Sequence, residues 1–369
     1  MAVKFLDLRK QTATLRAEIE PAIANVLANA AFIGGAEVEQ FEHEFGAFIG
    51  ANALGVGNGT DALEIAIEAL NLPKDSEVLL PANTFAASAE AVARNGLRLV
   101  FVDCDNTYTM SIADLERKIS PQTSAIMAVH LYGQSADMHA ICALAKQHNL
   151  QIIEDCAQAH GASFASQKVG TFGEIACFSF YPGKNLGAYG DAGAIVSNNA
   201  RLLATCRQIA HHGGLQKYEH SRIGRNSRLD SLQAAVLRVK LPHLNAWNAQ
   251  RDTIAHEYMR LLADTKGLVL PALRPQAQSV WHLFVVRILD GKRDIVRQRL
   301  AEAGIETGLH YPKALPSCAA YQNVPFVRTS ATPNACAWES EILSLPMGEH
   351  LDLAQAREVA DSLRNALVP

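Results

Sequence analysis

Residues 175–197, IACFSFYPGKNLGAYGDAGAIVS, place a single lysine, Lys184, in a turn between two apolar runs. The runs at 175–180 and 192–197 have the length and composition of buried strands. A proline and a glycine break the first run just before the lysine. Three more glycines follow it, at Gly187, Gly190 and Gly193. Because glycine lets the backbone approach a ligand closely, we expect these glycines to leave room for a cofactor and a substrate.

Five further apolar runs of strand length precede this stretch, at 53–57, 77–81, 97–103, 124–130 and 150–155. Helical patterns lie between them, for example at 61–71 and 138–149, where apolar residues recur every three or four positions. The runs do not alternate apolar with polar residues, which is typical of strands buried on both faces by helices. The sequence therefore predicts an α/β fold with a mostly parallel sheet of seven strands.

The pattern changes near residue 228, where a long helical region begins that is interrupted at Pro242. A strand and two helices follow, at 280–288, 294–304 and 351–367. We therefore expect a large α/β domain over residues 1–245 and a smaller α+β domain over residues 246–369.

Composition narrows the classes of protein. Hydrophobic residues make up 49% of the 369 residues and charged residues 19%, as in a compact soluble enzyme. Lys+Arg 33 against Asp+Glu 37 gives 33 − 37 = −4, and there is no dense basic run, so we expect no nucleic-acid partner. No apolar run reaches the roughly 18 residues of a membrane helix. Seven cysteines without a C-x-x-C pair, and a start without a signal-peptide core, predict a cytoplasmic protein with no disulfide framework and no metal site.

Three interpretations of Lys184 remain to be compared. A phosphate loop requires G-x-x-x-x-G-K-[ST], but Asn185 follows the lysine and Phe178 stands five positions before Gly183. A solvated loop lysine would explain neither the aromatic run nor the proline–glycine break. A partly buried lysine can instead form a Schiff base, most often with pyridoxal phosphate. That cofactor also requires a carboxylate at its pyridine nitrogen, donors for its phosphate and a support for its ring.

Two of these requirements have candidates at the ends of predicted strands. Glu154 and Asp155 close the strand at 150–155, and alternation sends them to opposite sides, so only one can face the ring. Gly59 and Thr60 stand between a strand and a helix, where free amides suit a phosphate. Thr60 or Asp61 could also serve simply as a helix cap.

Two further side chains complete the set. Ser179, in the strand before Lys184, offers a hydroxyl to the phosphate. Phe85, in the motif PANTF just after an apolar strand, is the candidate ring support, although a lone phenylalanine is more often part of the core.

Several motifs together resemble a known family. FSFYPGKNLGAYGDAGA, IIEDCAQAHGA, GVGNGTDAL, PANTF, VHLYGQSADM and GRNSRLDSLQAAVLRVKL are similar, in order and spacing, to the DegT/StrS family of nucleotide-sugar aminotransferases. The resemblance runs from 32–50 to 343–347 and implies an aspartate-aminotransferase-like fold of type I.

The resemblance implies a role for each matching position. Lys184 would form the Schiff base with the cofactor and carry the proton. Asp155, rather than Glu154, would pair with the pyridine nitrogen, and Gln158 would approach the phenolic oxygen. Phe85 would stack on the ring, while Gly59, Thr60 and Ser179 would hold the phosphate. Asn226 would reach the phosphate of the neighbouring subunit's cofactor and Arg228 the sugar nucleotide there, which implies a homodimer with shared active sites.

The motifs HLYGQSADM, SVWHLFVVR and GLHYP resemble enzymes that aminate C3 of a dTDP-linked 3-oxo-6-deoxyhexose, with L-glutamate as amino donor. Such enzymes supply deoxyamino sugars for surface polysaccharide, such as lipopolysaccharide O-antigen, or for glycosylated products. Tyr181, His310 and Tyr311 would then face the substrate.

Relatives that act on UDP-linked 3-oxo sugars share the HYP motif and are the first alternative. A non-catalytic regulator that binds pyridoxal phosphate is a second. Sugar dehydratases of the family carry histidine in place of the lysine, so Lys184 argues against that activity. A nicotinamide-dependent oxidoreductase is disfavoured, because the sequence lacks the strand–glycine–helix fingerprint of such enzymes near its start.

Overall fold

One large sheet organises the computed structural model, which describes residues 2–216 and 218–368. Its strand order is β1-β9-β8-β5-β4-β2-β3-β13. The strands are β1 Asn52–Val56, β2 Glu77–Pro81, β3 Arg98–Val102, β4 Thr123–Val129, β5 Gln151–Asp155, β8 Ile175–Ser179, β9 Gly193–Ser197 and β13 Val327–Arg328. Only β9 runs against the other strands of this sheet. The seven predicted strands thus lie in one mostly parallel sheet, and the predicted α/β fold is confirmed.

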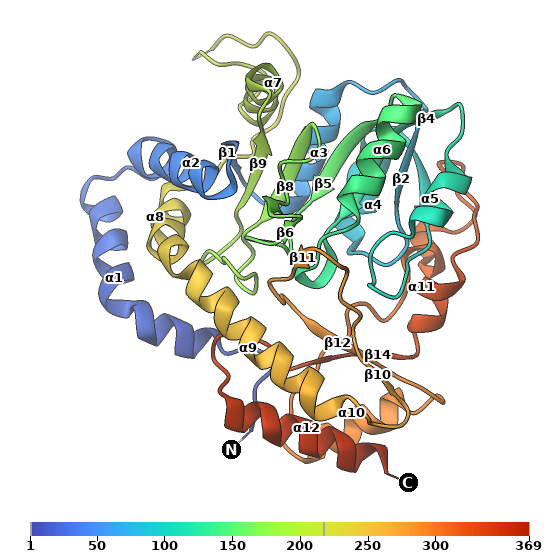
Figure 1. The fold of residues 1–369 in the computed structure, drawn as a ribbon. Coiled ribbons are helices and arrows are strands. Elements are labelled where there is room, and N and C mark those ends of the chain that lie inside the picture. Colours follow the sequence, from blue (N-terminus) through green and yellow to red (C-terminus); the bar gives the residue numbers. More distant parts are fainter. Residues whose placement is uncertain (1, 217, 369) are drawn as a thin grey trace.

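Helices cover both faces of this sheet (Figure 1). Leu80 and Phe101 pack toward α3 and α4, whereas their neighbours Leu79 and Val100 pack toward α5 and α6. Beside β8 and β9, helices α2 and α8 cover the second face. The helices are α1 Leu8–Ala28, α2 Ala36–Ile49, α3 Gly59–Leu70, α4 Ala86–Arg94, α5 Ile112–Lys118, α6 Met138–His148, α7 Ala200–Ala210, α8 Ser231–Lys240, α9 Leu244–Leu262, α10 Arg293–Glu302, α11 Pro333–Trp338 and α12 Leu353–Leu367.

A second, smaller layer holds both ends of the chain (Figure 1). The antiparallel strands β10 Leu268–Val269, β12 Phe284–Ile288 and β14 Ile342–Leu345 pack against α9, α10 and α12. The predicted strand at 280–288 starts only at Phe284, because residues 280 and 283 bond to the loop after β4 instead. The predicted domain division between residues 245 and 246 stays a prediction. Near it, α9 begins at Leu244.

The eighth strand of the large sheet, β13, was not predicted. The main chain at Val327 and Arg328 pairs in parallel with β3, and the Phe326 carbonyl accepts a hydrogen bond from the Leu99 amide at 2.7 Å. Trp338, further along, lies in the same core as β3. The C-terminal part of the chain therefore returns to the large sheet and covers its outer edge, which would otherwise expose unpaired backbone groups.

Three short strands form a separate sheet in the order β11-β6-β7, from Ala277–Gln278, Ser163–Phe164 and Gln167–Lys168. Among the residues that the structure describes, no helix is long and apolar enough to cross a bilayer. The seven cysteines are all free thiols.

Candidate active site

The predicted site residues gather at the carboxyl edge of the large sheet, where open α/β sheets bind ligands. Gly59 and Thr60 follow β1, Phe85 follows β2, Asp155 ends β5, Ser179 ends β8 and Lys184 comes just after it. Asp155 points to the same face of the sheet as Ile153, and Ser179 to the same face as Cys177. Both apolar neighbours lie in the core beside α3, so the carboxylate and the hydroxyl share one side of the sheet.

Asp155 is held in place by two donors. The Ser88 hydroxyl donates to Asp155 Oδ2 at 2.7 Å, and the Ala157 amide donates to Oδ1 at 3.1 Å. Because the hydrogen of Ser88 is committed to the carboxylate, the Thr84 hydroxyl at 3.0 Å must donate to Ser88. Ser88 was not predicted as a site residue, although it stands in the first turn of α4, next to the predicted site loop at 83–85.

Glu154 points to the opposite face, as the strand alternation predicted. Its carboxylate is fully buried and accepts hydrogen bonds from three backbone amides, those of Gly170, Phe172 and Gly173, at 2.7 to 2.8 Å. It also contacts His130 Nε2 at 3.0 Å. All its acceptor positions are used inside the protein, so Glu154 has no place in the site chemistry.

His130, Glu154 and Cys156 lie close enough together to suggest a metal site. However, the Ala136 amide donates to His130 Nδ1 at 3.1 Å, so the ring hydrogen is on Nε2 and points at Glu154. Both ring nitrogens of His130 are therefore used in hydrogen bonds within the core.

Lys184 stands in a tight turn at the end of β8. Its amide donates to the Tyr181 carbonyl at 2.8 Å, and the Ala188 amide reaches back to the Phe180 carbonyl at 2.8 Å. Burial lowers the pKa of Lys184 to about 8, although the negative charge of Asp155 opposes the shift. A lowered pKa supplies more of the neutral amine, which is the nucleophilic form.

Three neutral imidazoles surround the lysine. Burial lowers the pKa of His160 to about 3 and that of His310 to about 4, and it lowers the pKa of His282 well below its usual value. The positive charge of Lys184 contributes to all three shifts. Asp155 is therefore the charge that balances Lys184.

The glycines after Lys184 do not leave room for a ligand, so that expectation is wrong. A Cβ on Gly187 would lie 2.3 Å from the Pro182 carbonyl oxygen, and one on Gly193 would lie 2.5 Å from the Asn58 carbonyl group. The space beside Gly190 is filled by the Gln233 side chain, 3.0 Å from such a Cβ. These glycines allow the chain to pack against itself and so fix the turn that carries the lysine. The glycines do permit a close approach of the backbone, but the group that approaches is another part of the protein and not a ligand.

The phosphate candidates lie at the N-terminus of α3. The helix is capped by Asn58, whose side chain accepts a hydrogen bond from the Asp61 amide at 2.8 Å, so the alternative of Thr60 or Asp61 as cap is wrong. Within the described chain, the amides of Gly59 and Thr60 have no acceptor. A Cβ on Gly59 would lie 2.6 Å from Ser179 Cβ. Two free donors at a positive helix end, next to a serine hydroxyl, suit a phosphate.

Phe85, Gln158 and Tyr311 lie together above this edge. The Phe85 ring is 54% exposed, which is unlike a core residue, and its centroid lies 5.6 Å from that of Tyr311. Gln158 Nε2 donates to the Tyr311 hydroxyl at 3.0 Å, and Gln158 Oε1 accepts from the Tyr132 amide at 2.7 Å. A backbone amide can only donate, so the Gln158 oxygen must face Tyr132 and its N–H groups face the site.

Asn226 and Arg228 do not join this group within one chain. Arg228 Nε donates to Asn226 Oδ1 at 2.8 Å, and Asn226 is exposed. In the described residues neither side chain bonds to Lys184 or Asp155. Tyr181 lies next to the lysine turn and is 59% exposed. Their predicted contacts with a partner subunit or a substrate stay predictions.

Each requirement of pyridoxal phosphate thus has a suitable residue at one edge of the sheet: an amine of lowered pKa, a fixed carboxylate, free amide donors and an open aromatic ring. Fold and site together define the class of protein as a pyridoxal-phosphate enzyme of the aspartate-aminotransferase type. Comparison with known proteins gives the particular family. The model of the DegT/DnrJ/EryC1/StrS aminotransferase family matches residues 13–364, and the chain belongs to this family.

Characterised relatives agree with this assignment. The chain is 43% identical to dTDP-3-amino-3,4,6-trideoxy-alpha-D-glucose transaminase of Streptomyces venezuelae, over 98% of this chain and 95% of the relative. It is 42% identical to UDP-N-acetyl-3-dehydro-alpha-D-glucosamine 3-aminotransferase of Acidithiobacillus ferrooxidans, over 99% and 98%. The crystal structure of S. venezuelae DesV in complex with a ketimine intermediate superposes with a TM-score of 0.95 at 42% identity, covering 100% of this chain and 99% of that one. The protein is therefore an aminotransferase for nucleotide-linked ketosugars, and its family uses pyridoxal phosphate.

Proposed function

We propose that the protein transfers the amino group of L-glutamate to C3 of a dTDP-linked 3-oxo-6-deoxyhexose. The names of the two relatives agree on carbon 3 of the hexose and differ in the nucleotide. The slightly higher identity to the dTDP enzyme and the resemblance of the motifs HLYGQSADM and SVWHLFVVR support dTDP. The product would be a deoxyamino sugar for surface polysaccharide, such as lipopolysaccharide O-antigen, or for a glycosylated product made in the cytoplasm.

The placement of Lys184 close enough to Asp155 for their charges to interact supports this proposal most strongly. When bound, pyridoxal phosphate supplies an aldehyde that takes up the amino group and a ring that draws electrons from the neighbouring carbon. Lys184 offers a neutral amine near pH 8 and can return a proton to the same carbon from a fixed position. Asp155, which accepts hydrogen bonds from the Ser88 hydroxyl and the Ala157 amide, would pair with the pyridine nitrogen.

The remaining residues bind and orient. The free amides of Gly59 and Thr60, with the Ser179 hydroxyl, would hold the phosphate. Phe85 would cover one face of the ring, and the N–H groups of Gln158 would donate to the phenolic oxygen. Together these residues would hold the cofactor beside Lys184.

The substrate side of the site extends to Tyr181, His310 and Tyr311. We propose that Asn226 and Arg228 complete it from the partner subunit of a homodimer, since among the described residues of one chain their side chains bond only to each other. Recognition of the sugar nucleotide would then depend on both subunits.

One experiment tests the reaction and its specificity together. Purified enzyme with pyridoxal phosphate and glutamate is incubated with matched 3-oxo and 4-oxo hexoses, each linked to dTDP or UDP, and 2-oxoglutarate release is followed. We expect release with the dTDP-linked 3-oxo sugar. Preference for the UDP-linked 3-oxo sugar would support the alternative, and release only with 4-oxo sugars would contradict the proposal. Lys184→Ala is the control, since it keeps the phosphate and ring contacts but lacks the amine.

A further inference from the structure

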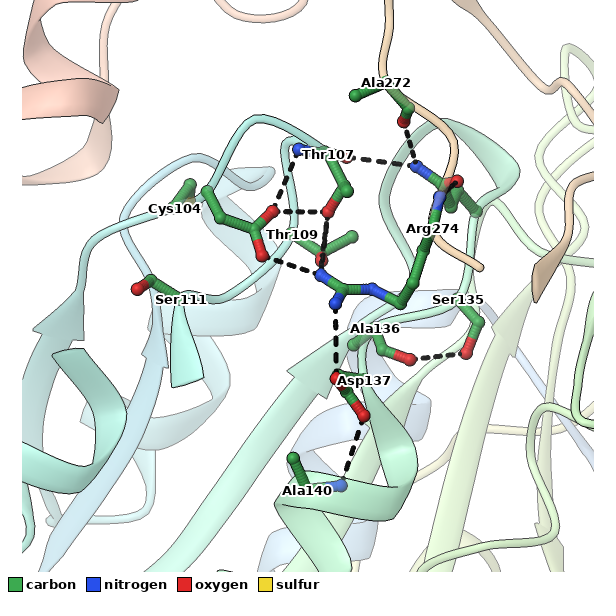
Figure 2. A network of polar contacts seen from close by, with 12 residues as sticks. Cys104, Thr107, Thr109, Ser111, Ser135, Ala136, Asp137, Ala140, Ala272 and Arg274 are labelled. Atoms are coloured by element: carbon green, nitrogen blue, oxygen red, sulfur yellow. Dashed lines mark hydrogen bonds and ion pairs between the residues drawn. The ribbon is translucent and has the colours of Figure 1, made fainter. Parts of the chain in front are cut away.

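Arg274, in the loop between β10 and β11, is the centre of a polar cluster that the reaction does not use (Figure 2). Its Nη2 donates to Thr107 Oγ1 at 2.9 Å and Thr109 Oγ1 at 3.0 Å, and pairs with Asp105 Oδ2 at 2.8 Å. Its Nη1 donates to Asp137 Oδ2 at 3.3 Å. The side chain is only 11% exposed. One guanidinium thus joins the turn after β3 to Asp137, the N-cap residue of α6.

Gln134 ties the same loop to the end of β4. Its Oε1 accepts a hydrogen bond from the Arg274 amide at 2.8 Å. Its Nε2 donates to the carbonyls of Ala272 at 3.0 Å and Thr107 at 3.3 Å. These backbone partners leave the amide only one orientation. We call Asp105, Thr107, Thr109, Gln134, Asp137 and Arg274 the Arg274 clamp.

The clamp borders an unfavourable turn. Tyr132, in the short 3-10 turn Leu131–Gly133, has φ 59°, a left-handed value that costs a non-glycine residue about 1 kcal/mol or more. Such a residue keeps its conformation only when its surroundings impose it. The Tyr132 carbonyl accepts from the Leu283 amide at 3.2 Å, and its ring packs on Tyr108 at 5.4 Å. Tyr108 lies between two threonines of the clamp, and Leu283 follows the clamped loop.

Tyr132 in turn contacts the site residues. Its amide donates to Gln158 Oε1 at 2.7 Å, and its hydroxyl donates to the His310 carbonyl. A rotation of the Tyr132 peptide would withdraw the donor that fixes the Gln158 side chain, and the Gln158 amide could then turn over. The orientation of Gln158 therefore depends on the conformation of the Leu131–Gly133 turn.

We propose that Arg274 is a positioning residue for Gln158, acting through the Leu131–Gly133 turn. By joining three loops around that turn, the guanidinium holds the Tyr132 amide toward Gln158, so that the Gln158 N–H groups stay directed at the cofactor oxygen. The inference rests on the role proposed above for Gln158. It does not require Arg274 to touch cofactor or substrate.

The first test needs no cofactor. Hydrogen–deuterium exchange of a peptide covering residues 130–136 is compared in the cofactor-free full-length protein and in Arg274→Met. We expect exchange at the Tyr132 amide to rise about tenfold, because the Leu131–Gly133 turn no longer holds this amide toward its acceptor on Gln158. Arg293→Met is the matched control, since Arg293 has the same 11% exposure and an acidic partner but lies in α10. Equal exchange in wild type and Arg274→Met would overturn the proposal.

The second test uses the holoenzyme and separates positioning from general stability. A donor at the phenolic oxygen favours its ionised form, so Gln158→Ala should raise the pH midpoint of the cofactor's visible band by about one unit. Arg274→Met should raise it in the same direction, Arg274→Lys by less, and Arg293→Met not at all. In the Gln158→Ala background, Arg274→Met should add no further shift.

The outcomes are distinguishable. A full additional shift in the double variant, or no shift in Gln158→Ala, would overturn the proposal. If wild type binds no pyridoxal phosphate, the proposed function fails, while the exchange experiment still decides whether Arg274 holds the turn.

Discussion

The lowered pKa of Lys184 predicts when the protein reacts with its cofactor. With a pKa of about 8, about a quarter of Lys184 is the neutral amine at pH 7.5. With the ordinary lysine value of about 10.4, only about one molecule in a thousand would be neutral. The folded site should therefore present more than one hundred times as much nucleophile as a free lysine at this pH.

The reactivity of Lys184 is measured by mixing cofactor-free protein with pyridoxal phosphate and following the visible absorbance. The initial rate, recorded between pH 6 and pH 10, should rise with a midpoint near 8. N-acetyl-lysine amide serves as the reference for an unburied amine. Lys184→Ala should give no band, and borohydride should fix no cofactor onto it.

Asp155→Asn supplies the sign of the electrostatic effect. Asp155 favours the charged amine, so its neutralisation should move the midpoint below 8. A midpoint near 10.4 in wild type, or an upward shift in Asp155→Asn, would refute the account of burial opposed by one carboxylate.

Three further substitutions distinguish residues that support the active site from residues that stabilise the fold. Ser88→Ala removes a charge-assisted bond to Asp155 and should weaken cofactor binding about tenfold in an absorbance titration, with little change in thermal unfolding. Glu154→Gln places an amide against three backbone donors and should lower the free energy of unfolding by roughly 3–5 kcal/mol in urea, while the visible band of the bound cofactor stays in place. Gly187→Ala forces the lysine turn away from Pro182 and should slow single-turnover amino transfer about a hundredfold; an unchanged rate would show that the turn tolerates displacement.

Much of the fold could be predicted because it depends on local patterns. Each of the seven predicted strands is a short apolar run bounded by turn residues, and all seven lie in the large sheet. The separation of Asp155 from Glu154 also follows from a local rule, the alternation of side chains along a strand. The placement of candidate residues at the carboxyl edge follows once the sheet is parallel.

The rest depends on contacts between distant segments. β13 is only two residues long and pairs with a strand more than two hundred residues earlier, so no periodicity marks it. A glycine indicates that something comes close, but the sequence does not say whether that is a ligand or, as at Gly193, the Asn58 backbone. The bond from the Tyr132 amide to Gln158 likewise requires the three-dimensional structure. The choice of Asp155 over Glu154 and the roles of Gln158, Asn226 and Arg228 came from family resemblance, and the roles of all the site residues stay predictions to be tested.

Glu154 affects the register in which the central strand β5 pairs with its neighbours. The two adjacent carboxylates differ in the length of their side chains and in what surrounds them. If β5 slipped by one residue so that Glu154 took the place of Asp155 and faced the lysine, Ile153 would enter the ring of amides around Glu154. An apolar side chain cannot accept hydrogen bonds from the three donors, so a misaligned strand would lose those bonds together. The buried glutamate therefore favours the native register of β5 over the slipped register that would put the wrong acid beside the cofactor.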